Sequence, residues 1–235
     1  MSGSITVQGR LVLADRVTPG RIVVEDDRIV AVEPDAAADD GPYIAPGFID
    51  VHCHGWGGHD AMGGADALDG TSRALLRHGV TSFLPTGYTL PVPDIQRFCD
   101  SVRAWMPVAP EDGAQPLGFN LEGPFVAPAR KGAHNPDWLR APADLSDDDI
   151  APFFDGLRIT TIAPELPGAL ELIARLRELG VVTSISRPPI VNRPSGMPAT
   201  RIASLTRISR SAGLLRTMIG HSDGWTWWPS AMSSA

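Results

Sequence analysis

Two histidines separated by one residue, His52 and His54, follow the apolar run at residues 48–51. Alternate side chains of an extended strand point to the same face, so the two imidazoles project together and Cys53 points the other way. Two imidazoles held this close at a strand end are typical of half a divalent-metal site. The alternative is a polar strand end whose histidines are satisfied by local hydrogen bonds.

A carboxylate follows another predicted strand, residues 117–122, which ends in Glu122. Glu122 and Asn120 lie on the face opposite the apolar side chains of this strand. An inward carboxylate is costly unless it meets a cation or hydrogen-bond donors. We therefore predict that Glu122 is a third metal ligand, and the alternative is a salt bridge to Arg130 or Lys131.

A polar loop, residues 131–136, comes soon after Glu122 and contains His134. Loops that follow the strands of α/β folds carry many substrate contacts. His134 is suited to donate a hydrogen bond to a sugar or phosphate oxygen, but a solvent-exposed histidine explains the same residue equally well.

The elements that must position these side chains alternate between strand and helix. We predict strands at residues 48–52, 80–86, 117–122, 159–165 and 181–185, and helices at residues 65–78, 94–105 and 169–179. The first strand has the apolar character of a buried strand. Such alternation indicates a parallel sheet with right-handed crossovers, whose chemistry collects at the carboxyl ends of the strands. His52, His54 and Glu122 all lie at such ends.

The segment before this pattern contains short β-branched runs, at residues 5–7, 11–13 and 21–32, with a hairpin turn predicted at Asp26 and Asp27 and a loop at residues 35–41. We divide the chain into residues 1–45, which carry these short strands; residues 46–186, a partial barrel of alternating strands and helices; and residues 187–235, an aberrant tail that is disordered or read in a shifted frame.

The composition narrows the class of protein. Of the 235 residues, 43% are hydrophobic and 20% are charged, which is typical of a globular protein. The formal net charge of −7 argues against nucleic-acid binding, and no signal sequence or membrane span is evident. Two cysteines are too few for a disulfide framework. We expect a cytoplasmic protein.

The tail differs in charge from the rest of the chain. Asp223 is its only acid after residue 186, whereas six arginines occur there. Four prolines between residues 188 and 198 prevent the helix that should follow the fifth strand, and residues 202–206 suit a sixth strand. We interpret the change as a shift of reading frame near Ser186, which the other two frames of the gene would reveal.

Four stretches resemble the amidohydrolase superfamily, and within it the N-acetylglucosamine-6-phosphate deacetylases. They are residues 45–55 (APGFIDVHCHG), 121–125 (LEGPF), 131–136 (KGAHNP) and 161–165 (TIAPE). The second and third are the most specific, because a His-X-His pair alone admits many amidohydrolases. The resemblance covers residues 1 to about 186, roughly half of a family member.

The resemblance implies an α/β fold, here an incomplete (β/α)8 TIM-type barrel of five to six strands with a small N-terminal β-sandwich segment. It implies that Glu122 ligates a divalent metal ion, zinc or else iron, manganese or cobalt, and that His52 and His54 complete a second metal position. Ala133 and His134 would line the sugar pocket. The implied reaction releases acetate from N-acetylglucosamine 6-phosphate, the implied partner is this sugar phosphate, and a homodimer is possible by the same resemblance.

The chain departs from the family pattern after the fifth strand. Ser186-Arg187-Pro188 stands where the family has Gly-His-Ser/Thr, and Arg207 stands where the family has a second histidine. Arginine cannot coordinate a divalent ion. Residues 220–223 (GHSD) repeat the missing letters too late in the chain, which we interpret as coincidence, and the catalytic aspartate would lie beyond the chain end.

These departures leave three functions open. We expect the chain to turn over the deacetylase substrate barely or not at all. The second alternative is a non-catalytic fragment or pseudoenzyme that binds a sugar phosphate or a partner subunit. The third alternative is an amidohydrolase that acts on another N-acyl substrate.

Overall fold

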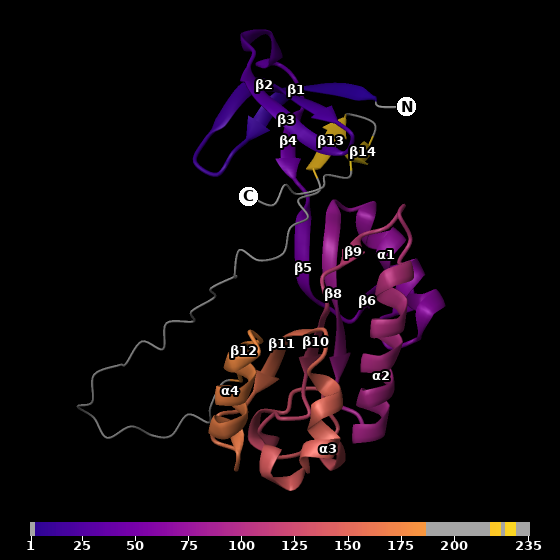
Figure 1. Cartoon of the computed structure of the whole chain (residues 1–235), viewed down its shortest axis with the longest axis vertical. Helices are drawn as coiled ribbons and strands as arrows, with labels where there is room; N and C mark the ends of the chain where they lie inside the picture. The colour runs from indigo at the N-terminus through magenta and orange to yellow at the C-terminus, as the bar shows by residue number, and fades with distance from the viewer. Residues whose placement is uncertain (1–2, 187–216, 222–223, 229–235) are drawn as a thin grey trace, which may run out of the picture.

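The computed structural model describes residues 3–186, 217–221 and 224–228. A mixed, mostly antiparallel sheet forms one end of the molecule, and a parallel sheet with its helices forms the other (Figure 1). The chain passes from one sheet to the other at Gly47, between β4 (Tyr43–Pro46) and β5 (Phe48–Cys53). The predicted domain boundaries at residues 45/46 and 186/187 remain a prediction.

This mixed sheet has the strand order β14-β13-β4-β1-β2-β3, in which β1 and β4 pair parallel and the other pairs are antiparallel. Its N-terminal strands are β1 (Ser4–Val12), β2 (Val17–Glu25), β3 (Arg28–Pro34) and β4 (Tyr43–Pro46). Asp26 and Asp27 connect β2 to β3 with φ angles of 47° and 65°. Positive φ at both central residues matches the right-handed twist of a hairpin, so the predicted turn is confirmed. The predicted loop at residues 35–41 contains one 3₁₀ turn, Ala36–Ala38.

Two late strands join this sheet. The strands β13 (Thr217–His221) and β14 (Gly224–Trp228) form an antiparallel hairpin, and β13 also pairs antiparallel with β4. The sequence pattern did not predict these strands. The predicted sixth strand at residues 202–206 lies outside the described residues.

The parallel sheet has the order β12-β11-β10-β8-β5. Its strands are β5 (Phe48–Cys53), β8 (Val80–Tyr88), β10 (Phe119–Glu122), β11 (Leu157–Ile162) and β12 (Val182–Ile185). The helices between them are α1 (Ala65–Leu76), α2 (Val92–Trp105), α3 (Asp147–Ile150) and α4 (Ala169–Glu178). The short strand β9 (Gln115–Pro116) also pairs with β8, whereas β6 (Gly55–Trp56) and β7 (His59–Asp60) form a separate two-stranded antiparallel sheet. The predicted alternation of strand and helix and the parallel pairing are confirmed.

The helices pack on the sheet through apolar faces that the sequence spacing predicts. In α1, Leu68, Leu75 and Leu76 are buried, and Gly79 follows the helix with a φ of 89° that suits a helix C-terminus. The largest core cluster lies between α1, α2, α4 and the sheet, and Phe83, Trp105 and Phe119 are among its fully buried members. Among the described residues, no helix is both long enough and apolar enough to span a membrane.

The predicted burial of the first parallel strand is wrong. Phe48 is 67% exposed, Ile49 54% and Val51 42%. The strand β5 lies at the edge of the sheet, and β8 is its only strand neighbour among the described residues. Apolar residues alone cannot bury a strand, because burial needs a packing surface opposite each face and a neighbour at each edge.

Both cysteines, Cys53 and Cys99, are buried. Burial raises the pKa of the Cys53 thiol, and it raises the pKa of the Cys99 thiol to about 12. We expect neither thiol of the folded protein to react rapidly with a disulfide reagent at pH 8, because a pKa near 12 leaves about one Cys99 in ten thousand as thiolate. Unfolding in urea should release two reactive thiols, and a fast reaction of either one before unfolding would contradict the burial.

Candidate metal centre

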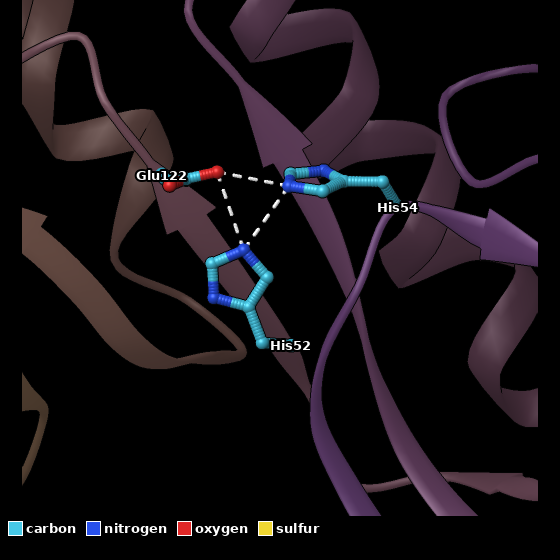
Figure 2. Close-up of side chains that lie close together, drawn as sticks. All are labelled: His52, His54 and Glu122. Carbon is cyan, nitrogen blue, oxygen red and sulfur yellow. Dashed lines mark hydrogen bonds and ion pairs between the residues drawn. The ribbon is translucent and has the colours of Figure 1, made fainter. Parts of the chain in front are cut away.

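The three predicted metal-ligand residues lie together at the carboxyl ends of two strands. His52 belongs to β5 and His54 follows its last residue, whereas Glu122 ends β10. The strand β8 lies between β5 and β10, so tertiary folding brings Glu122 to the histidine pair across one intervening strand. All three side chains point toward one another (Figure 2).

One nitrogen or oxygen from each side chain forms a small triangle. The distance between His52 Nε2 and His54 Nε2 is 3.0 Å. Glu122 Oε2 lies 3.2 Å from His52 Nε2 and 2.9 Å from His54 Nε2. The side chains of His52, His54 and Glu122 remain 43%, 40% and 33% exposed, so an ion or a ligand can reach the triangle from solvent.

The hydrogen bonds of His54 determine what the triangle can hold. His54 Nδ1 lies 3.0 Å from the carbonyl oxygen of Thr86, which can only accept, so Nδ1 carries the hydrogen. In a neutral imidazole, Nε2 is then a bare acceptor that faces another acceptor, Glu122 Oε2. Two acceptors 2.9 Å apart require either a shared proton or a cation between them.

The pKa shifts describe the protonated form of this pair. The hydrogen bond with His54 is the main cause that lowers the pKa of Glu122 to about 2. The hydrogen bond with Glu122 is likewise the main cause that raises the pKa of His54. Without a cation, the site therefore favours an imidazolium beside a carboxylate, and a metal ion would take the place of that proton.

The donor set fits a divalent transition-metal ion. Imidazole nitrogen and carboxylate oxygen are common zinc ligands, and a tetrahedral ion with bonds of about 2.0–2.1 Å would separate neighbouring donor atoms by about 3.3 Å. The observed separations of 2.9–3.2 Å are close to this spacing. The alternative salt bridge from Glu122 to Arg130 or Lys131 is not formed, and the ion-pair partners of Glu122 among the described residues are histidines.

Each strand end is completed by a glycine that no other residue can replace without strain. Gly55 follows His54 with a φ of 136°, and Gly123 follows Glu122 with a φ of 111°. A side chain on Gly55 would overlap the carbonyl oxygen of His59, and one on Gly123 would overlap Thr89 Oγ1. The backbone thus turns away immediately after each ligand, which leaves the ligand side chains open to the pocket.

A cleft of about 520 Å³ adjoins the triangle. Its wall includes His54, Glu122, Tyr88, Thr89, Val126, Arg130, Lys131, Gly132, Ala133, His134, Asn135, Trp138, Thr161 and Ser186. The predicted substrate residues Ala133 and His134 therefore both line it.

The side chain of His134 is 12% exposed, and its Nε2 lies 3.9 Å from Glu122 Oε1. Burial is the main cause that lowers the pKa of His134, which favours the neutral imidazole.

Sequence reasoning missed two residues of the site on β8. Thr86 fixes the His54 ring through its carbonyl oxygen, and Tyr88 packs edge-on against that ring with 5.9 Å between the ring centroids. Tyr88 ends a parallel strand, so the rule that chemistry gathers at strand ends would have found it. Thr86 acts through its backbone, and no residue-type signal reveals such a contact.

Comparison with known proteins identifies the family to which this chain is similar. The sequence model described as the Amidohydrolase family matches residues 43–179. An N-acetylgalactosamine-6-phosphate deacetylase from Escherichia coli O157:H7 is 38% identical over 168 residues, which cover 67% of this chain and 43% of that protein. An N-acetylglucosamine-6-phosphate deacetylase from Bos taurus is 36% identical over 176 residues, which cover 71% and 41%.

Solved structures of deacetylases also align with this chain. A mutant N-acetyl-D-glucosamine-6-phosphate deacetylase from Mycobacterium smegmatis, in complex with N-acetyl-D-glucosamine-6-phosphate, aligns with a TM-score of 0.69 and 29% identity over 79% of this chain and 50% of that one. The N-acetylglucosamine-6-phosphate deacetylase from Thermotoga maritima aligns with a TM-score of 0.70 and 27% identity over 78% and 49%. The predicted incomplete barrel fold is confirmed, and the chain spans half or less of the length of these proteins.

Proposed function

We propose that this chain, which belongs to the amidohydrolase family, holds a divalent metal ion between His52, His54 and Glu122 and serves the deacetylation of an N-acetyl amino-sugar phosphate. The single observation that carries the proposal is the triangle of ligand atoms at the cleft. His54 Nε2 and Glu122 Oε2 face each other at 2.9 Å with Nδ1 of the same ring already committed to Thr86. A cation between them would accept one lone pair from each of the three ligand atoms at once.

A divalent ion at this place supplies Lewis-acid activation of an amide carbonyl and of a water molecule. The residues of the chain hold and orient the reactants. Glu122 contributes the negative charge of the ligand set, and the hydrogen bond to Thr86 keeps the ring of His54 in the tautomer that leaves Nε2 free to bind. His134, neutral and mostly buried in the cleft wall, is suited to donate a hydrogen bond to the substrate.

The cleft has the chemistry of a sugar-phosphate site. Arg130 and Lys131 contribute positive charge to its wall, which suits a phosphate group. Ala133 adds little side-chain bulk beside His134, which leaves room for a ring-sized ligand. The names of the relatives support N-acetylglucosamine 6-phosphate as the substrate and make its galactose epimer the first alternative. Homodimer formation remains a prediction.

A second candidate function is binding without turnover, as a pseudoenzyme or a subunit of a larger enzyme. The observation that favours it is the presence of Arg187 and Arg207 at positions where the resemblance implies metal-ligating histidines. Both arginines lie outside the described residues. The two candidates share the metal centre and differ in acetate release.

The test is an assay of the purified chain with zinc, manganese, cobalt or ferrous iron. We expect sugar-phosphate binding that requires the metal, accompanied by slow release of acetate from N-acetylglucosamine 6-phosphate. Release from unphosphorylated N-acetylglucosamine should be slower still, because the positive charges of Arg130 and Lys131 then meet no phosphate group. N-acetylgalactosamine 6-phosphate serves as the matched epimer.

The outcomes separate the candidates. Metal-dependent acetate release supports the enzyme, and metal-dependent binding with no release supports the binding protein. Neither binding nor release in the presence of any of these ions would contradict the proposal, as would equal release after the metal is removed with a chelator.

A further inference from the structure

The histidine-bearing end of β5 departs from regular pairing with β8. Asp50 pairs with Phe83 and Cys53 pairs with Pro85, so three residue steps on β5 oppose two on β8. This count is that of a β-bulge, a local irregularity that re-aims side chains. Pro85 has no N–H group to donate to β5, which weakens the ladder at the same point. His52 lies inside the bulge and His54 follows it.

Three side chains take over the hydrogen bonds that the bulge removes from the ladder. Asp50 Oδ1 accepts from the backbone N–H of His52 at 3.0 Å. Asn120 Nδ2 donates to the carbonyl oxygen of Val51 at 3.0 Å, so the peptide unit between Val51 and His52 is held at both ends. The next N–H, that of Cys53, donates to Thr86 Oγ1 at 2.9 Å.

The two side chains that reach β5 from other strands, those of Thr86 on β8 and Asn120 on β10, are buried. Thr86 is 0% exposed, and its hydroxyl donates to the carbonyl oxygen of Leu84 at 3.0 Å, which turns an oxygen lone pair toward Cys53. Asn120 is 2% exposed and belongs to β10. Because β8 lies between β10 and β5, the hydrogen bond of Asn120 to Val51 takes its side chain past β8. Asn120 also precedes Glu122 by two residues on the same strand face. It therefore ties the strand of the carboxylate to the strand of the imidazoles.

We propose that Asn120 and Thr86 are positioning residues for the metal centre. They hold the bulge of β5 in the arrangement that aims His52 and His54 at Glu122. Asp50 contributes by accepting the hydrogen bond from the N–H of the peptide between Val51 and His52. This inference rests on the proposed metal site. Residues that orient metal ligands without touching the ion change metal affinity by about tenfold to a hundredfold when they are mutated.

The experiment measures the dissociation constant for zinc by competition with a chromophoric chelator, together with the visible absorption spectrum of the cobalt-substituted protein. The test variants are Asn120→Ala and Thr86→Val, the second of which keeps the shape of the side chain and removes its acceptor. Thr86→Ser restores a hydroxyl. Ser72→Ala is the matched control, since Ser72 is also 0% exposed and its hydroxyl donates to the carbonyl oxygen of Ala114, which lies before β9 and outside the strands that carry the ligands.

We expect Asn120→Ala and Thr86→Val each to weaken zinc binding by about tenfold to a hundredfold and to alter the cobalt spectrum. Thr86→Ser and Ser72→Ala should keep the zinc affinity and the spectrum, although Ser72→Ala should lower the resistance to urea. Wild-type affinity and spectrum in both test variants would overturn the proposal, and so would an equal loss in Ser72→Ala. If Asn120→Ala does not fold, the comparison of Thr86→Val with Thr86→Ser still tests the positioning role of the Thr86 hydroxyl.

A ligand variant keeps this inference separate from the proposed function. His54→Ala removes a predicted ligand and leaves Asn120 and Thr86 in place. If His54→Ala binds zinc as tightly as the parent chain, the metal site itself is wrong. If His54→Ala loses zinc while Asn120→Ala and Thr86→Val retain it, only the positioning role is wrong.

Discussion

Replacing Glu122 with glutamine is expected to weaken zinc binding by more than about a hundredfold, beyond the range typical of residues that only orient ligands. Glu122 supplies the only negative charge of the triangle, and its Oε2 lies within 3.2 Å of both histidine nitrogens. The amide keeps the size of the side chain but loses the charge, and it leaves two neutral imidazoles as ligands. Competition with a chromophoric chelator measures the loss, and metal-dependent binding of sugar phosphate should disappear with it.

The same variant changes a second measurable quantity. Because Glu122 is the main cause of the raised pKa of His54, this pKa should fall in metal-free Glu122→Gln, which a proton NMR titration would follow. Glu171→Gln is the matched control, since Glu171 is exposed in the first turn of α4 and should leave both quantities unchanged. Zinc affinity in Glu122→Gln within tenfold of the parent chain would show that the triangle is not a metal centre.

Replacing Phe119 with alanine is expected to reduce the free energy of unfolding by about 3–5 kcal/mol, the usual cost of removing a buried aromatic ring. Phe119 is 0% exposed and packs edge-on against Phe98, with 5.9 Å between the ring centroids. Phe119 is also the first residue of β10, the strand that ends in Glu122. Urea denaturation followed by circular dichroism measures the change, and a loss of this size removes much of the stability of an ordinary domain.

Phe48→Ala is the matched control for this prediction. It removes the same ring from β5, where Phe48 is 67% exposed, and should change the free energy of unfolding by less than about 1 kcal/mol. A smaller loss from Phe119→Ala than from Phe48→Ala would contradict the described core. It would instead indicate that the exposed face of β5 is covered in solution.

The positions of most elements could be predicted because their signals are local. The apolar spacing of Leu68, Leu75 and Leu76 identifies α1, and the predicted strands at residues 80–86 and 159–165 agree with β8 and β11 within a few residues of their observed bounds. The turn at Asp26 and Asp27 follows from residue type alone. In each case, the conformation depends on neighbours within a few residues along the chain.

The burial of β5 and the two late strands could not be predicted in the same way. Phe48 and Ile49 have the apolar character of core residues, yet whether they are covered depends on what lies beside and opposite the strand. The hairpin of β13 and β14 pairs with β4, whose residues lie more than a hundred positions earlier in the chain. Pairing over such a distance leaves no periodic signal in a single sequence.

The sequence by itself determined the chemistry of the candidate site: two imidazoles on one strand face and a carboxylate at the end of another strand, each followed by a glycine. Only the tertiary structure decided that these side chains converge within 3.2 Å and that the ring of His54 is fixed by the backbone of Thr86. It also decided that Asn120 holds Val51 across an intervening strand. The physical reason is that residue type and spacing fix the direction of a side chain relative to its own strand, whereas distances between strands arise from sheet order and register, which are set by packing over the whole domain.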